Sequence, residues 1–236
     1  MSAAVRGALA IVGVACAVIY LAVYDIEPLL PRVLVKPVPI LCLATWVGLA
    51  ARGWTGRLVV LGLLASAAGD VVLMGEGDGF FVGGLVCFLV AHLLYIAAFV
   101  VEVRRPAPLR ALPFLAFALF VFLFLLPGLG SMVPPVAVYC LAIAAMGWRA
   151  AARVGAGTAP VGIAWIGVAG AALFIVSDSM IAVRSFHAPF PGAGLAIMVT
   201  YYLGQLGIAW SVAFSEPGLP DTPRSRRTSD GFPASP

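Results

Sequence analysis

Residues 80–101 read FFVGGLVCFLVAHLLYIAAFVV and contain no Asp, Glu, Lys or Arg. A helix needs roughly 20 apolar residues to cross the hydrocarbon core of a bilayer, and this stretch supplies them. The rest of the chain has the same character, because 63% of its 236 residues are hydrophobic and only 10% are charged. Soluble domains are about 25% charged. So little polar surface cannot cover a water-soluble globule, and the sequence therefore predicts a polytopic membrane protein.

The apolar stretches predict eight transmembrane helices in one domain over residues 1–214. The pattern of alternating ten-residue segments typical of an outer-membrane barrel is absent, which favours an all-α protein. Prolines and serines dominate residues 215–236 and cannot build a core, so this part is predicted to be a disordered cytoplasmic tail. The expected spans are 5–24, 33–51, 57–75, 80–101, 109–127, 133–152, 160–183 and 195–214.

The basic residues predict the orientation of these spans. With the N-terminus inside, the inner segments carry 11 basic residues and the outer segments carry only Arg32, Lys36 and Arg184. This asymmetry follows the positive-inside rule and places both termini in the cytoplasm. The basic residues are spread along the chain, so we expect no nucleic-acid partner. The use of 13 arginines against one lysine suggests a GC-rich bacterial genome, and hence a bacterial plasma membrane.

Two short patterns recur in spans that lie four apart. Pro37-Val38-x-x-x-Cys42-Leu43-Ala44 returns 98 residues later as Pro135-Val136-x-x-x-Cys140-Leu141-Ala142. The segment around Asp70 returns 108 residues later around Asp178. Spans four apart cross the membrane in the same direction, so the pattern predicts a parallel 4+4 internal repeat about an axis along the membrane normal. Chance similarity between apolar segments is the alternative.

Ionisable groups inside spans are costly and usually face the interior of a bundle. Here they are Lys36, Asp70, His92 and Asp178. At 1.5 Å per residue, both aspartates lie in the outer half of the membrane and His92 lies near its middle. Polar companions occur in the same spans: Ser66, Tyr95, Ser177, Ser179, Tyr201, Tyr202 and Gln205.

Each of these residues also has a structural interpretation. An aspartate can cap a helix or bond to a neighbour, and His92 can be a buried hydrogen-bonding residue. Tyr201 and Tyr202 can belong to the aromatic belt at the interface. Lys36 can extend to the lipid headgroups, or it can face inward toward a phosphate or an aspartate.

Several other chemistries lack the residues they need. The chain has only two histidines, and four cysteines without CxxC spacing, so we expect no metal and no cofactor. Neither a G-x-S-x-G nucleophile elbow nor a glycine-rich phosphate loop is present.

Five motifs in order resemble the lysoplasmalogenase family of eight-span membrane proteins, also called the YhhN-like family. The resemblance covers residues 5–214 and implies hydrolysis of the vinyl-ether bond of lysoplasmalogens to a fatty aldehyde and a glycerophospho-amine. The lysophospholipid substrate would come from the surrounding membrane lipids. The motifs are Lys36-Pro37, Gly69-Asp70, Phe88-x-x-x-His92-x-x-Tyr95, Gly170-Ala171-x-Leu173-Phe174-x-x-Ser177-Asp178-Ser179 and Tyr201-Tyr202-x-x-Gln205.

This reaction requires a protonated acid, an anion near the developing positive charge and a positioned water. Two carboxylates can divide the first two roles, as they do in glycoside hydrolysis. We therefore expect Asp70 and Asp178 to be catalytic together with His92, with either aspartate as the acid. Substrate and water would be held by Lys36 at the phosphate and by a group of hydroxyl and amide side chains: Ser66, Tyr95, Ser177, Tyr201, Tyr202 and Gln205.

Two other functions fit the same residues. In a proton-coupled transporter of small molecules or lipids, Asp70 and Asp178 would be relay groups with access to both membrane faces. In a noncatalytic membrane scaffold, the buried carboxylates would only pair across helices. The oligomeric state is not predicted by the sequence.

Overall fold

The computed structural model describes residues 2–25 and 29–215 of the chain. These residues form α-helices joined by turns and short 3-10 segments, and no strand occurs among them. The predicted tail lies outside the described residues, apart from Ser215. The α-helices are α1 (Ala3–Val23), α2 (Leu29–Val35), α3 (Val38–Ala50), α4 (Gly53–Val72), α5 (Asp78–Glu102), α6 (Leu112–Leu125), α7 (Val133–Ala152), α8 (Val161–Phe186) and α9 (Ala193–Ala213).

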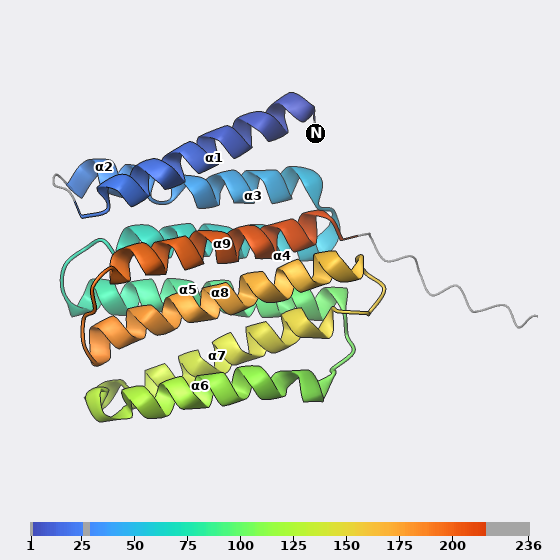
Figure 1. The fold of residues 1–236 in the computed structure, drawn as a ribbon. Helices are drawn as coiled ribbons and strands as arrows, with labels where there is room; N and C mark the ends of the chain where they lie inside the picture. The colour runs from blue at the N-terminus through green and yellow to red at the C-terminus, as the bar shows by residue number, and fades with distance from the viewer. Residues whose placement is uncertain (1, 26–28, 216–236) are drawn as a thin grey trace, which may run out of the picture.

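Within the described residues, eight helical segments are long and apolar enough to span a membrane, which confirms the predicted all-α polytopic fold. The boundaries agree to within a few residues; the largest shift is at α4, which begins four residues before the expected start at residue 57. The start of α1 and the end of α9 lie at the same end of the bundle (Figure 1). We call this the terminal end, and the opposite end, where α4 joins α5, the distal end.

The helices form an elongated bundle with α1 and α6 on its two flanks (Figure 1). The flanking helices are the least buried: about 11% of the α1 span and 22% of the α6 span are buried inside the protein, against 50% of the α9 span. Leu119, Phe120 and many other side chains of the flanking helices point outward. Exposing such large apolar faces to water is unfavourable, whereas contact with lipid chains has no such cost.

The two central helix pairs, α4 with α5 and α8 with α9, make the most extensive contacts. Glycines permit the close approach of α8 and α9. A Cβ on Gly170 would lie 2.6 Å from the backbone nitrogen of Ile208, and a Cβ on Gly204 would lie 2.8 Å from that of Phe174. Small residues at such crossings let helices pack through their backbones, which holds the polar side chains of α8 and α9 in a fixed register.

The order of helix contacts in the first half of the bundle recurs in the second half. Helix α1 packs on α3 as α6 packs on α7, α3 packs on α4 as α7 packs on α8, and α4 packs on α5 as α8 packs on α9. Across the halves, α3 packs on α9 and α7 packs on α5. An internal duplication predicts this order, and the duplication itself stays a prediction.

Candidate functional site

The first intramembrane carboxylate, Asp70, lies near the distal end of α4 and is 2% exposed. The Tyr201 hydroxyl donates a hydrogen bond to its Oδ2 over 2.7 Å. The Lys36 Nζ lies 3.6 Å from Oδ1 and donates to the Asp70 backbone carbonyl over 3.2 Å. Lys36 thus faces inward to Asp70, which is one of its two predicted positions, and does not extend to the lipid headgroups.

A helix break places Lys36. The second span is divided into α2 and α3 at Lys36 and Pro37. Proline has no backbone N–H and disfavours helical backbone in the residue before it, so a helix commonly ends here. The Tyr202 hydroxyl donates a 2.8 Å hydrogen bond to the Lys36 carbonyl oxygen at the break. The predicted residue Tyr202 therefore fixes the backbone from which the Lys36 side chain reaches Asp70.

The second carboxylate, Asp178, lies on α8 and has different neighbours. The Tyr139 hydroxyl donates to its Oδ2 over 2.5 Å, and the His92 Nε2 lies 3.4 Å from the same oxygen. In the described part of the chain, no Lys or Arg forms an ion pair with Asp178. His92 is completely buried and packs against the ring of Phe174, with 4.7 Å between ring centroids. The two aspartates thus have unlike environments, one with a cation and one without.

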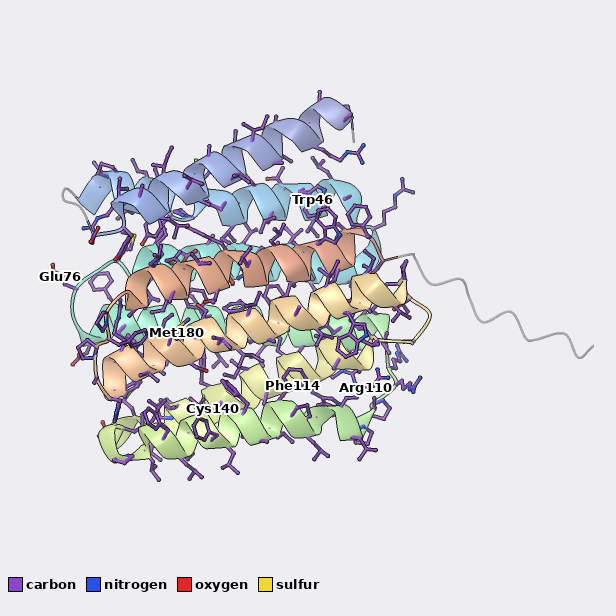
Figure 2. All side chains as sticks on the ribbon, in the orientation of Figure 1. Trp46, Glu76, Arg110, Phe114, Cys140 and Met180 are labelled. Carbon is purple, nitrogen blue, oxygen red and sulfur yellow. The ribbon has the colours of Figure 1, made fainter. Side chains whose placement is uncertain are left out.

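Both aspartates line one cavity of about 590 Å³ at the distal end of the bundle. Its wall includes the exposed residues Glu76, between α4 and α5, and Asp78, the first residue of α5, so it reaches the surface there. Figure 2 shows Glu76 at this end and Arg110 at the other. The remaining polar part of the wall comes from α1, α2, α8 and α9 and from the residues that directly follow α1 and α2: Tyr20, Tyr24, Arg32, Lys36, Ser177, Arg184 and Tyr201.

The other predicted site residues lie behind this wall. The Tyr95 hydroxyl donates a 2.7 Å hydrogen bond to Gln205 Oε1 and so joins α5 to α9. Ser66 is fully buried, and its hydroxyl oxygen has no hydrogen-bond partner among residues 2–25 and 29–215. His92 and Tyr202 are also absent from the cavity wall. The structure therefore gathers Lys36, Asp70, Ser177, Asp178 and Tyr201 at the cavity and places Ser66, His92, Tyr95, Tyr202 and Gln205 in the layer beneath.

Ser177 and Ser179 flank Asp178 and differ in their contacts. The Ser177 hydroxyl donates to the Ile197 carbonyl over 3.0 Å, which ties α8 to α9 at the cavity. The Ser179 hydroxyl donates to the Ile175 carbonyl within α8. Ser177 therefore helps to hold Asp178 opposite α9, whereas the Ser179 hydroxyl bonds only within α8.

Tyr139 is a site residue that the sequence did not reveal. Its hydroxyl bonds Asp178, yet in the sequence it is one tyrosine in an apolar span. The available signal was its position directly before Cys140, inside the pattern that recurs from the second span to the sixth.

The terminal end contains a second buried polar cluster that was also not predicted. Arg153 is 0% exposed, and its Nε lies 3.0 Å from Glu102 Oε2. Its guanidinium also donates to the Ser211 and Ser215 hydroxyls, each over 2.8 Å. Arg149 is buried as well and donates to backbone carbonyls of the 103–106 segment. These groups hold α5, α7 and α9 together and fill the end of the bundle away from the cavity.

The cavity offers anionic and cationic side chains but no metal-binding arrangement. In the described part of the chain, no group of three or more His, Cys, Asp or Glu side chains could hold a metal ion. The side chains of the cavity can transfer protons at two carboxyl groups and can bind an anion at Arg32, Lys36 and Arg184.

Comparisons with known proteins agree with the sequence resemblance. Residues 31–212 match the model of the YhhN family. The chain is 38% identical over 202 residues to lysoplasmalogenase TMEM86A of Bos taurus, with 80% of each chain covered. It is 40% identical over 180 residues to lysoplasmalogenase TMEM86B of Homo sapiens, with 75% of this chain and 74% of the relative covered. No solved structure matches the chain.

Proposed function

The chain belongs to the YhhN family, and from this premise we propose that it hydrolyses the vinyl-ether bond of alkenyl lysophospholipids in the membrane. The products are a fatty aldehyde and a glycerophospho-amine. One observation carries the proposal beyond the family: two intramembrane carboxylates with unlike partners line a single cavity that is open at one end.

Asp178 is the acid in this proposal, and Asp70 is the anion. The Lys36 ammonium beside Asp70 stabilises an ionised carboxylate, whereas Asp178 has only a hydroxyl and an imidazole beside it. Both neighbours of Asp178 face its Oδ2, which leaves Oδ1 for the proton that is transferred.

The reaction then proceeds in three steps. The π electrons of the vinyl ether take the proton of Asp178 at the β-carbon, which leaves an oxocarbenium ion next to the Asp70 carboxylate. Water bonds to the α-carbon and returns a proton to Asp178. The hemiacetal so formed breaks its bond to the glycerol oxygen; that oxygen takes up a proton and leaves as the alcohol, while the hemiacetal hydroxyl loses its proton and becomes the aldehyde carbonyl.

The remaining predicted residues support these two groups. Lys36, with Arg32 and Arg184 in the same wall, gives the substrate phosphate a cationic environment. Tyr201 and Ser177 touch the cavity and fix the carboxylates on either side of it. His92 acts through Asp178 and is a positioning residue. In the layer beneath the cavity, Tyr95 and Gln205 join α5 to α9, Tyr202 fixes the backbone at Lys36, and Ser66 lies buried on α4.

We also propose that the protein lies in a bacterial plasma membrane with both termini in the cytoplasm. The known relatives reported above are mammalian, so this proposal depends on the arginine usage and on the basic residues of the terminal end. The cavity would then open to the outside. Reporter fusions after residue 25 and after residue 215 test the orientation, because only the first should report a location outside the cytoplasm.

A proton-coupled transporter remains the alternative function. It needs a path from the cavity to the terminal end, where Arg153 and Glu102 now fill the bundle. Uptake of a lysolipid into vesicles, with no aldehyde formed, would favour this function over hydrolysis.

The proposed hydrolysis is tested by incubating the purified protein with an alkenyl lysophospholipid and measuring free aldehyde. Asp70→Asn and Asp178→Asn should each lower the rate by about 100-fold or more, since positioned proton transfer contributes about 10²–10⁴-fold and stabilisation of a developing charge about 10²–10³-fold. Asp25→Asn is the matched control, because Asp25 is exposed and lies outside the cavity wall. Full activity in both folded cavity variants would refute the assigned roles.

A further inference from the structure

A second, narrower cavity lies next to the first. It has a volume of about 30 Å³ and lies between α5, α6, α7 and α8. Apolar side chains make almost all of its wall, among them Val121 and Leu125 of α6 and Val136, Cys140 and Ile143 of α7. Figure 2 shows Cys140 where α7 runs beside α6. We call this cavity the apolar crevice.

The crevice and the polar cavity meet at Asp178. Five residues line both: Leu73, Phe81, Phe88, Asp178 and Ile181. Among the described residues that line the crevice, Asp178 is the only one with a carboxyl group, and no Lys or Arg lines it. The carboxyl group therefore marks the boundary between a polar space and an apolar one.

An alkenyl lysophospholipid has the same order of parts along its length. Its glycerophosphate is polar, its hydrocarbon chain is apolar, and its vinyl ether is the first segment of the chain, at the junction. We propose, on the basis of the proposed function, that the hydrocarbon chain occupies the apolar crevice while the headgroup lies in the polar cavity. This placement brings the vinyl ether to Asp178 and identifies α6 and α7 as the helices that select the chain.

The crevice has room for only about one or two water molecules, so the hydrocarbon chain must widen it. Helix α6 can move for this purpose, because it lies on the flank of the bundle and only 22% of its segment is buried. Leu125 and Val121 of α6 pack in a small apolar cluster with Val136 and Cys140 of α7, apart from the main core. An opening between α6 and α7 does not disturb the contact between α8 and α9, and this contact holds Asp178 in its position.

The test is to fill the crevice and compare two chain lengths. Cys140→Phe places a ring in the crevice, and Val136→Phe, one helical turn earlier, is a second variant if the first does not fold. Leu141→Phe is the matched control, since Leu141 is the next residue and is 63% exposed on the outer face of α7. Each protein is given lysophospholipids with a hexadecenyl or a butenyl chain, and kcat/KM is obtained from aldehyde release.

We expect the ratio of hexadecenyl to butenyl kcat/KM to fall about tenfold in the crevice variants, because the added ring occupies space that the long chain needs and the short chain does not. The ratio in the Leu141→Phe protein should equal that of the parent. An unchanged ratio in both folded crevice variants, with the parent active, overturns the crevice proposal and leaves the hydrolase intact. No aldehyde from the parent protein with either chain overturns both proposals.

Discussion

The ion pair between Lys36 and Asp70 can be tested by removing one charge at a time. At 3.6 Å, two unit charges attract by about 5 kcal/mol at an effective dielectric constant of 20. Asp70→Asn leaves the Lys36 ammonium buried without its counter-charge. Breaking a buried pair in this way costs about 3–5 kcal/mol, and we expect about 3 because Asp70 lines a polar cavity. Lys36→Met should cost less, about 2 kcal/mol, because the Tyr201 hydroxyl still bonds the carboxylate.

The double variant measures the interaction itself. Lys36→Met with Asp70→Asn removes both charges, so it should lose about 2 kcal/mol and not the sum of the two single losses, about 5. Unfolding by sodium dodecyl sulfate in mixed micelles, followed by circular dichroism, gives the four free energies of unfolding. Asp25→Asn, a change on an exposed turn, should stay within about 0.5 kcal/mol of the parent.

Additive losses in this cycle would refute the reasoning. If the double variant loses the sum of the single losses to within about 0.5 kcal/mol, the two groups do not interact and Lys36 does not stabilise the anionic form of Asp70. The roles proposed for the two aspartates would then lose their physical basis.

Three further substitutions test other parts of the structure. Gly170→Ala should destabilise the protein by about 2 kcal/mol because its Cβ meets the α9 backbone at 2.6 Å, whereas Gly7→Ala, with nothing within 4 Å, should not destabilise it in the same unfolding assay. Arg153→Met should cost about 3 kcal/mol by leaving a buried glutamate unpaired, while Arg57→Met, at an exposed position, should be nearly neutral. Tyr139→Phe should lower aldehyde release about tenfold and stability by about 1–2 kcal/mol, because it removes one buried hydrogen bond to the second carboxylate; full aldehyde release by the folded variant would contradict this.

Hydropathy and charge were sufficient to predict the spans. The outward faces of these helices meet only lipid, so their sequence has to be apolar whatever the neighbouring helix is. The depth of Asp70 and Asp178 also follows from counting residues along a helix, because the rise per residue is constant. Both aspartates line the same cavity at the distal end, as their similar depth suggested.

Contacts between helices could not be predicted in this way. The positions of Arg149 and Arg153 near a span end matched the positive-inside rule, which describes only their membrane side. In the structure both are buried and bind groups on other helices, a result that depends on which helices pack together. The bond between Tyr139 and Asp178 has the same origin. Lys36-Pro37, in contrast, carried a local signal for a helix break, because proline acts on its own backbone and on the residue before it.

The one-ended cavity has a consequence for the traffic of lipids and protons. If water enters through the opening near Glu76, the acidity of a single compartment governs both Asp70 and Asp178. The water-soluble product of a hydrolase built on this plan would be discharged into that same compartment, while the aldehyde would stay in the bilayer. Lysolipid generated in the opposite leaflet would first have to flip across, which makes lipid flipping an upstream control of its breakdown.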